Sequence, residues 1–294
     1  MKKEFFLERY RKLRGDIAEF SLRNSLRVNT LKVQPEDLKS RLEKKGVSLE
    51  TIPFISNAFY YKARFSLGST PEYLMGYYYL QEAASMLPAV VLGPQPGEVV
   101  LDMCAAPGSK TTQICELMRN EGVVIAVEEK ANRAYALANN LERMGCWNAA
   151  IVRQNALKIE NNKIFDKILL DAPCSGNYLS EPNWFEKRDL RGIRRNSELQ
   201  KKLVEKAFSL LKVGGILVYS TCSLEPEEDE EIVDYAVRVL GMSTEETGLK
   251  IGSPAATNFE EREYDKSVAL ARRLWPSRTG TQGFFIARLR KVNE

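Results

Sequence analysis

The stretch LDMCAAPGSKTTQI, residues 101–114, joins an apolar strand to a helix through a run of small residues. Ala105, Ala106, Gly108 and Ser109 lack bulky side chains, so the chain can turn tightly there and a ligand can approach its backbone. A strand that leads through such a turn into a helix is a common unit of α/β folds. The stretch therefore predicts an α/β domain with a ligand crevice at this turn.

The alternation of strands and helices continues along the chain. The strands are short and apolar on both faces, as in KILLD (167–171), which is typical of a parallel sheet covered by helices. Strands are expected at 98–102, 122–128, 149–153, 166–171 and 215–221, and helices at 80–92, 109–119, 131–144, 197–212 and 227–240. Residues 241–282 are poorly patterned, and GFFIARLRK (283–291) predicts a last strand. This pattern predicts a doubly wound, Rossmann-like domain over residues 80–294.

Residues 1–79 have a different pattern and predict a second, smaller α/β domain. Apolar residues recur at helical spacing over 1–23, which indicates one or two amphipathic helices. These residues are Phe5, Phe6, Leu7, Tyr10, Leu13, Ile17, Phe20 and Leu22. A strand at 25–32, a helix at 35–46 and a strand at 54–65 follow.

Composition restricts the class of protein. The chain has 294 residues, 44% hydrophobic and 28% charged, and no apolar run long enough to cross a bilayer. Its N-terminus lacks the apolar core of a secretion signal. A cytoplasmic, monomeric protein without membrane contact is expected. The net charge of +4 is compatible with nucleic acid.

Charge is unevenly distributed along the chain. Residues 186–195 and 271–278 are basic, and residues 225–231 are acidic. Taken alone, each run is most simply interpreted as a solvated face. Pro226 and the acids after it also suit the first turn of a helix. The N-terminus of that helix would direct partial positive charge towards Cys222 and favour its thiolate.

The chain has no histidine, which excludes His-based triads, dyads and metal sites. Five cysteines stand at 104, 115, 146, 174 and 222, without C-x-x-C spacing. Neither a disulfide framework nor a metal site is therefore expected. Acid–base or nucleophilic chemistry must therefore use Cys, Asp, Glu, Lys, Tyr, Ser, Thr or water.

The crevice suits a nucleoside. Glu128 ends a strand about 20 residues after Gly108, the spacing at which an acid meets a ribose hydroxyl. The dinucleotide fingerprint G-x-G-x-x-G is absent. A P-loop is an alternative, because PGSKT is followed by ILLD (168–171), but Ser109 replaces a glycine that this motif requires. S-adenosylmethionine fits better, and a plain tight turn is the remaining alternative.

Two cysteines follow neighbouring strands, in DAPCSG (171–176) and STCS (220–223). Adjacent parallel strands end at one crevice, so the thiols of Cys174 and Cys222 should approach one another beside Asp171. One cysteine at a strand end is more often inert packing, but two favour chemistry. A thiolate that adds to cytosine C6 makes C5 nucleophilic towards a methyl donor. Asp171 suits the N3/N4 edge of the base.

Six segments resemble motifs of the Nol/Nop/Sun family of RNA 5-methylcytosine methyltransferases. They are LRVNTLK (26–32), LQEAASMLPAVVL (80–92), LDMCAAPGSKT (101–111), DAPCSG (171–176), YSTCSLEPEEDE (219–230) and GFFIARLRK (283–291). The resemblance extends from about residue 20 to the end. It implies a class I methyltransferase fold with an antiparallel C-terminal strand, and a small N-terminal RNA-binding domain related to RRM folds.

The resemblance also implies a role for each site residue. Cys222 would be the nucleophile, Cys174 would assist product release, Asp171 would lie at the base, and Lys110 would line the catalytic pocket. The loop that would bind S-adenosylmethionine comprises Cys104, Ala105, Ala106, Pro107, Gly108, Ser109 and Lys110. Glu128 would hold the ribose hydroxyls, with Arg133 nearby. Asn155 stands where the family usually has an adenine-binding Asp, and its carbonyl can accept the same hydrogen bond.

The compact build is similar to archaeal tRNA methyltransferases of the family, so tRNA is the expected substrate and ribosomal RNA the alternative. A catalytically inactive RNA-binding protein is an alternative of another class, although both cysteines argue against it. The basic runs would grip phosphates. Tyr178, Trp184 and Phe185 would stack on bases, with local packing equally open. Arg27 and Asn29 would contact RNA or pack a strand.

Overall fold

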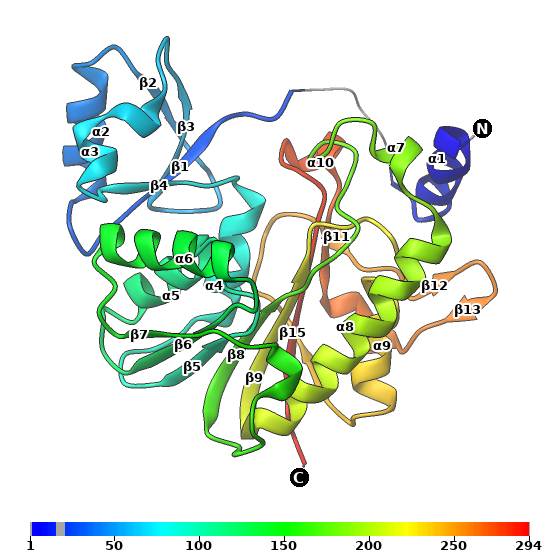
Figure 1. Ribbon diagram of the computed structural model, residues 1–294. Coiled ribbons are helices and arrows are strands. Elements are labelled where there is room, and N and C mark those ends of the chain that lie inside the picture. Colours follow the sequence, from blue (N-terminus) through cyan, green and yellow to red (C-terminus); the bar gives the residue numbers. More distant parts are fainter. Residues whose placement is uncertain (1, 16–20, 294) are drawn as a thin grey trace.

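The computed structural model describes residues 2–15 and 21–293. Its larger sheet runs in the order β11-β14-β15-β9-β8-β5-β6-β7. The parallel strands are β5 (Val99–Asp102), β6 (Val123–Val127), β7 (Ala149–Val152), β8 (Phe165–Asp171) and β9 (Leu211–Thr221). Strand order reverses at β5, where β6 lies on one side and β8 on the other, and Figure 1 shows this sheet edge-on between two helical layers. This arrangement confirms the Rossmann-like prediction.

The C-terminal strand is antiparallel, as the resemblance implied. β15 (Phe284–Arg290) pairs with β9 over six residues. β14 (Arg272–Leu274), β10 (Ser243–Glu245) and β11 (Ser253–Pro254) extend this edge, and β12 (Asn258–Phe259) pairs with β13 (Arg262–Glu263). These short strands occupy the segment that has no clear sequence pattern, because two or three residues are too few to show a period.

Helices cover both faces of the sheet. One face holds α4 (Leu87–Leu92), α5 (Ser109–Leu117) and α6 (Ala131–Met144), and the other holds α8 (Leu190–Leu210) and α9 (Glu230–Arg238). In β8, Leu169 belongs to the apolar cluster under α4–α6 and Leu170 to the cluster under α8 and α9. Alternate residues therefore enter two cores, which explains why the strands are apolar throughout.

The N-terminal sheet is antiparallel, in the order β2-β3-β1-β4. Its strands are β1 (Ser25–Val28), β2 (Ser48–Thr51), β3 (Ala58–Lys62) and β4 (Tyr78–Leu80), with helices α2 (Pro35–Glu43) and α3 (Pro71–Leu74). Leu26, Val28, Leu38, Leu42 and Phe59 are among the residues of its own apolar core.

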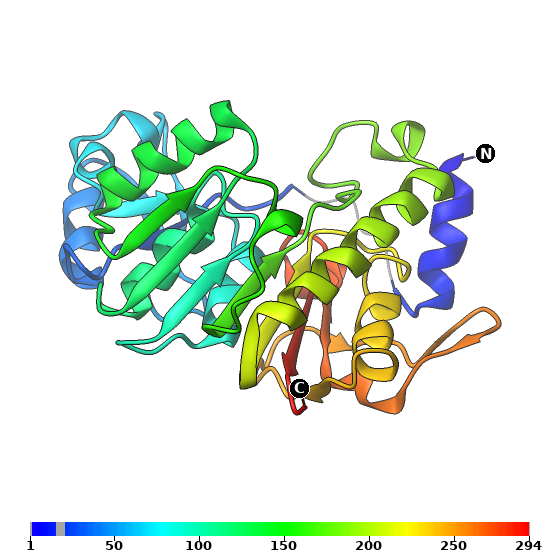
Figure 2. The same cartoon turned by 60° about the horizontal axis from the view of Figure 1, so that its bottom comes forward.

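Helix α1 (Lys2–Lys12) lies apart from that sheet. Figures 1 and 2 show it beside α7 (Trp184–Lys187) and α8, on the other side of the molecule from β1–β4. Phe6 contacts Trp184 edge-on with a ring-centroid distance of 4.9 Å, and Tyr10 is also buried in the larger core. Ile17 and Phe20, which belong to the predicted second helix, lie outside the described residues.

Some predicted elements differ from the structure. The helix expected over 80–92 is wrong at its start, because Tyr78–Leu80 completes the small sheet and Pro88 starts α4 in its first turn. The helix expected from 227 begins at Glu230. In contrast, α8 begins earlier than expected because the Asp189 side chain accepts from the Gly192 amide at 2.8 Å and caps it. Four-residue helix α10 (Pro276–Thr279) precedes β15.

Candidate active site

The loop after β5 makes the turn predicted from the small residues. Gly108 caps α5 with φ +104, a conformation that favours glycine. A Cβ there would lie 3.0 Å from Leu137 Cδ1, so the turn packs closely on α6. The buried Asp102 carboxylate accepts from Thr111 Oγ1 at 2.7 Å, and burial raises its pKa to about 6. Sequence reasoning missed Asp102, although it precedes the turn directly.

The two strand-end thiols meet. β8 and β9 pair with Asp171 opposite Ser220, and the Sγ atoms of Cys174 and Cys222 lie 3.3 Å apart. This distance confirms the predicted approach. The hydrogen bond from Cys174, with the nearby Lys110 cation, lowers the pKa of Cys222, although burial opposes it. The same hydrogen bond and burial raise the pKa of Cys174 well above its usual range. Of the two, Cys222 is therefore the thiol that loses its proton first.

Lys110 and Asp171 form an ion pair beside the thiols. Lys110 Nζ lies 2.7 Å from Asp171 Oδ2 and donates to Ser85 Oγ at 2.9 Å. Ser220 Oγ donates to Asp171 Oδ1 at 2.8 Å, so both carboxylate oxygens are held. The predicted catalytic residues are thus brought together at the ends of β5, β8 and β9. In contrast, burial and Asp102 raise the pKa of Cys104, so its thiol stays protonated.

The loops that carry the cysteines are fastened to each other by two side chains that sequence reasoning missed. The Glu228 carboxylate accepts from the Ser175 amide at 3.0 Å, from Ser175 Oγ at 2.6 Å and from Asn196 at 2.8 Å. Asn177 donates to the Cys222 carbonyl at 2.8 Å. These contacts set the position of Cys174 relative to Cys222. The dense acidic block directly after Cys222 was the available signal for Glu228.

Comparison with known proteins identifies the family. The family model described as 16S rRNA methyltransferase RsmB/F matches residues 89–290, more than half of the chain. The chain belongs to the RsmB/F family of RNA cytosine-C5 methyltransferases. A model for the N-terminal domain of 16S rRNA methyltransferase RsmF matches residues 3–83. The resemblance expected from the sequence motifs is therefore confirmed.

Relatives of known sequence differ in their RNA substrates. The tRNA (cytosine(49)-C(5))-methyltransferase of Pyrococcus abyssi is 40% identical over 97% of this chain and 95% of its own length. The human 28S rRNA (cytosine(4447)-C(5))-methyltransferase is also 40% identical, over 92% of this chain and 34% of its own length. The chain therefore spans about a third of the human relative and nearly all of the archaeal one.

Two solved structures are similar over almost the whole chain. A methyltransferase homolog protein from Pyrococcus horikoshii is 42% identical, with a TM-score of 0.87 over 98% of this chain and 95% of that one. NSun6 from the same organism, solved with SFG, is 28% identical, with a TM-score of 0.84 over 99% and 95%. The RsmB/F fold thus extends through both sheets.

The side chains that line the cofactor crevice of this RsmB/F chain suit the polar groups of S-adenosylmethionine. Glu128 places a buried carboxylate at the end of β6, suited to ribose hydroxyls, and Asp171 suits an ammonium group. Arg133 Nη1 lies 3.3 Å from Glu128, and its Nη2 donates to the Ala106 carbonyl at 2.7 Å, so it joins the two binding segments. Asn155 Oδ1 accepts from the Leu157 amide at 2.9 Å and keeps a second lone pair for a ligand.

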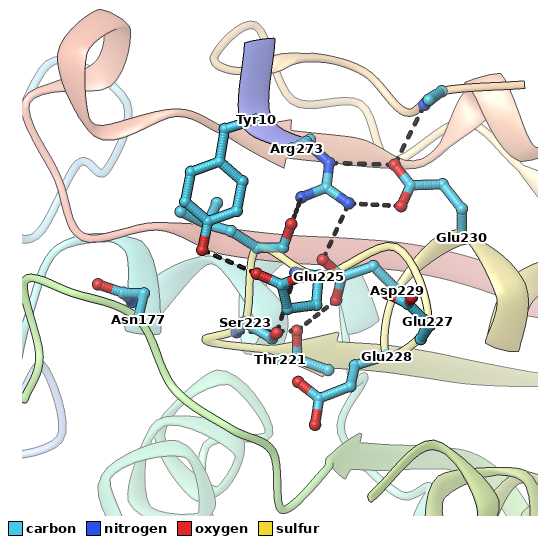
Figure 3. Close-up of polar contacts among 12 residues, drawn as sticks. Tyr10, Asn177, Thr221, Ser223, Glu225, Glu227, Glu228, Asp229, Glu230 and Arg273 are labelled. Atoms are coloured by element: carbon cyan, nitrogen blue, oxygen red, sulfur yellow. Dashed lines mark hydrogen bonds and ion pairs between the residues drawn. The ribbon is translucent and has the colours of Figure 1, made fainter. Parts of the chain in front are cut away.

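The acidic run is buried, and its interpretation as a solvated face is wrong. Figure 3 shows Glu225, Asp229 and Glu230 around the Arg273 guanidinium and the Tyr10 hydroxyl. Arg9 Nε lies 3.1 Å from Glu225 Oε2. Burial raises the pKa of Glu225 to about 7. The partners are distant in sequence, so the run alone did not reveal them.

The helix expected from residue 227 begins later in the chain, and the effect of its N-terminus on Cys222 stays a prediction. α9 begins at Glu230, and the Asp229 side chain before it accepts from Thr221 Oγ1 at 2.6 Å. The Cys174 thiol and the Lys110 cation lower the pKa of Cys222.

Several predicted RNA contacts are structural instead. Trp184 is buried and donates to the Ser175 carbonyl at 2.7 Å. Arg27 is buried 3.4 Å from Glu116 of α5, and Asn29 donates to the carbonyl of Met144 in α6 at 2.8 Å, so both join the small sheet to these helices. Arg273 is held by the acidic run. Local packing is therefore the correct interpretation for these residues.

Phe185 stacks on Tyr178 with a ring-centroid distance of 5.6 Å and an interplanar angle of 16°. Both side chains are half-buried, so their expected stacking on bases stays a prediction. Within the described residues, no helix combines the length and apolar character needed to cross a bilayer.

Proposed function

We propose that this chain methylates C5 of a cytosine in tRNA, with Cys222 as the nucleophile. The observation that carries the proposal is the pair of thiols 3.3 Å apart beside the Lys110–Asp171 ion pair. The reaction needs one of the two thiols to ionise first. The hydrogen bond from Cys174 and the Lys110 cation lower the pKa of Cys222 and so favour its ionisation. The site therefore brings a thiol that ionises more readily than its neighbour next to a hydrogen-bonding carboxylate, in a chain without histidine.

The first step makes C5 nucleophilic. The Cys222 thiolate forms a bond to cytosine C6, and the C5–C6 π electrons move into the ring towards N3. Asp171 accepts from the N4 amine, and the Lys110 cation compensates the charge that develops at the ring edge. S-adenosylmethionine, when bound by the 104–110 loop, Glu128 and Asn155, supplies an electrophilic methyl group for C5.

The last step restores the aromatic ring. The C5 proton must leave, the C5–C6 double bond must form again, and the bond between C6 and Cys222 must break. We propose that Cys174 assists this release. Once Cys222 is bonded to carbon it carries no negative charge, so it no longer opposes ionisation of Cys174. After Cys174 has released its own proton to solvent, its thiolate can take up the C5 proton. The C5–H electron pair then forms the C5–C6 double bond, and Cys222 departs as a thiolate.

Transfer RNA is favoured over ribosomal RNA because the archaeal relative that bears a tRNA name matches this chain over nearly its full length. For that substrate we further propose a cytoplasmic location, and a division near residue 79 into an RNA-binding domain built on β1–β4 and a methyltransferase domain on which α1 packs. The ribosomal names of other relatives support rRNA as the second candidate.

The function is tested by incubating the chain with tritiated S-adenosylmethionine and either unmodified tRNA transcripts or deproteinised rRNA. Bisulfite sequencing then maps the labelled cytosine. Label at one tRNA cytosine is the expected result, and label only in rRNA would support the second candidate. RNA binding without any label would favour an inactive RNA-binding protein.

A further inference from the structure

A groove opens beside Cys174. Its volume is about 790 Å³, and its lining includes Cys174, Ser175, Arg188, Arg191 and Arg195. Figures 1 and 2 show α7 and α8, which frame it, on the other side of β8 and β9 from α5 and α6. The groove therefore reaches Cys174 from the side of the sheet that α8 covers.

The charge of this groove is unbalanced. Lys187 and Arg188 are both paired with Glu181, and Arg188 Nε also donates to the Ser175 carbonyl at 2.9 Å. Arg191 and Arg195 are exposed, and neither forms an ion pair with another residue of the described ranges 2–15 and 21–293. Asp189 is the acid in the lining, and its carboxylate is already used as the cap of α8. Four cations and one acid thus line the groove, which leaves it with a net positive charge.

Arg191 and Arg195 are four residues apart on α8, so they lie on one face of the helix, with Cβ atoms about 5–6 Å apart. A guanidinium group binds phosphate oxygens through paired N–H donors and stays charged at any working pH. The groove ends at Cys174, 3.3 Å from the nucleophile that must reach the base. A nucleotide whose base is on Cys222 would have its own backbone within reach of this groove.

We propose that the groove binds the RNA backbone phosphates next to the target cytosine, through Arg191 and Arg195. The inference rests on the proposed function and adds the route of the RNA strand across the site. A cytosine taken out of its stack loses the stacking and pairing energy that held it there. Phosphate contacts beside the pocket offset this cost and hold the extruded nucleotide. They act on RNA binding and leave the thiol chemistry unchanged.

The test compares Arg191→Ala/Arg195→Ala with a control, Lys202→Ala/Lys266→Ala. The control removes the same charge from two exposed positions of the same domain that lie outside the groove lining. Binding of a fluorescein-labelled tRNA transcript is measured over a series of KCl concentrations without methyl donor. Steady-state methylation of the same transcript gives kcat and KM, and thermal unfolding confirms that each variant is folded.

The groove variant should raise KM about tenfold and leave kcat within about twofold. The slope of log affinity against log salt should fall by about 0.7–1 for each arginine, whereas the control keeps the wild-type slope. An unchanged slope in the groove variant, or an equal loss in the control, would overturn the proposal. The binding arm requires no methyl transfer. A wild-type chain that binds tRNA but transfers no methyl group would count against the proposed function alone.

Discussion

The two thiols of the site are not equivalent, and their neighbours explain why. The hydrogen bond between the thiols separates their pKa values most, whereas Glu228 raises the pKa of both. At Cys222 the Lys110 cation partly offsets Asp171, which raises the pKa of that thiol. The sequence predicted that the thiols would meet, because both follow adjacent strands. Their order came from resemblance to the family alone. The hydrogen bond between the thiols, together with Lys110, now supplies a physical reason for the same order.

Replacement of Lys110 by Met should raise the pKa of Cys222, because the nearby cation no longer stabilises its thiolate. Alkylation of Cys222 by iodoacetamide, followed by mass spectrometry over a pH series, should show its midpoint at higher pH. Ser85→Ala is the control, since it removes only the hydroxyl that contacts Lys110 at 2.9 Å. A midpoint that stays at the wild-type pH in the Lys110 variant would show that the cation does not act on this thiol.

At the scale of elements, two loops form the site and side chains from elsewhere hold them. Glu228 fastens the loop after β8, and Arg9 of α1 pairs with Glu225 in the loop after β9. Neither contact was predictable, because each joins residues separated by 50 or more positions. The strands and the long helices α6 and α8 were predictable, since a regular apolar period over many residues reveals them.

Glu228→Gln should move Cys174 away from its place beside Cys222, because the NH2 group that replaces one carboxylate oxygen cannot accept a hydrogen bond. Either the Ser175 hydroxyl, or the Ser175 amide and Asn196 together, then lose their acceptor. A loss of kcat of about tenfold or more, with KM little changed, is expected in steady-state assays. Glu198→Gln on α8 is the control, since Glu198 is exposed and pairs with the half-buried Lys201. Equal kcat values for both variants would remove the positioning role.

Arg9→Met should destabilise the fold by about 3 kcal/mol, because it leaves the buried Glu225 without its cation. Arg11→Met on the same helix should change little, since the Arg11–Glu4 pair is largely exposed. Urea unfolding at pH 7.5 compares the two. Equal midpoints would mean that α1 contributes no more through its buried ion pair than through an exposed one.

On the scale of the whole molecule, the buried carboxylates make stability depend on pH. The pKa of Glu225 is raised from 4.5 to about 7, and that of Asp102 from 3.8 to about 6. The folded chain therefore holds protons that the unfolded chain releases. The stabilising contribution of Glu225 is complete below pH 4.5 and is lost as the pH rises through 7.

The free energy of unfolding should therefore rise as the pH falls from 8 to 5, by an amount on the order of 2–3 kcal/mol for Glu225. Glu225→Gln should weaken this dependence, because a neutral amide binds no proton. Urea unfolding at pH 5, 6, 7 and 8 measures both slopes. Parallel curves for the two proteins would show that Glu225 titrates normally in the fold.

The central claim is that Cys222 bonds to the RNA and Cys174 releases it. The most direct measurement is a denaturing gel of Cys174→Ala after incubation with S-adenosylmethionine and a tRNA transcript that the wild type methylates. A protein–RNA band that survives denaturation is predicted for Cys174→Ala, and none for Cys174→Ala/Cys222→Ala. A covalent band that persists in the double variant, or its absence from the single variant, would contradict the account.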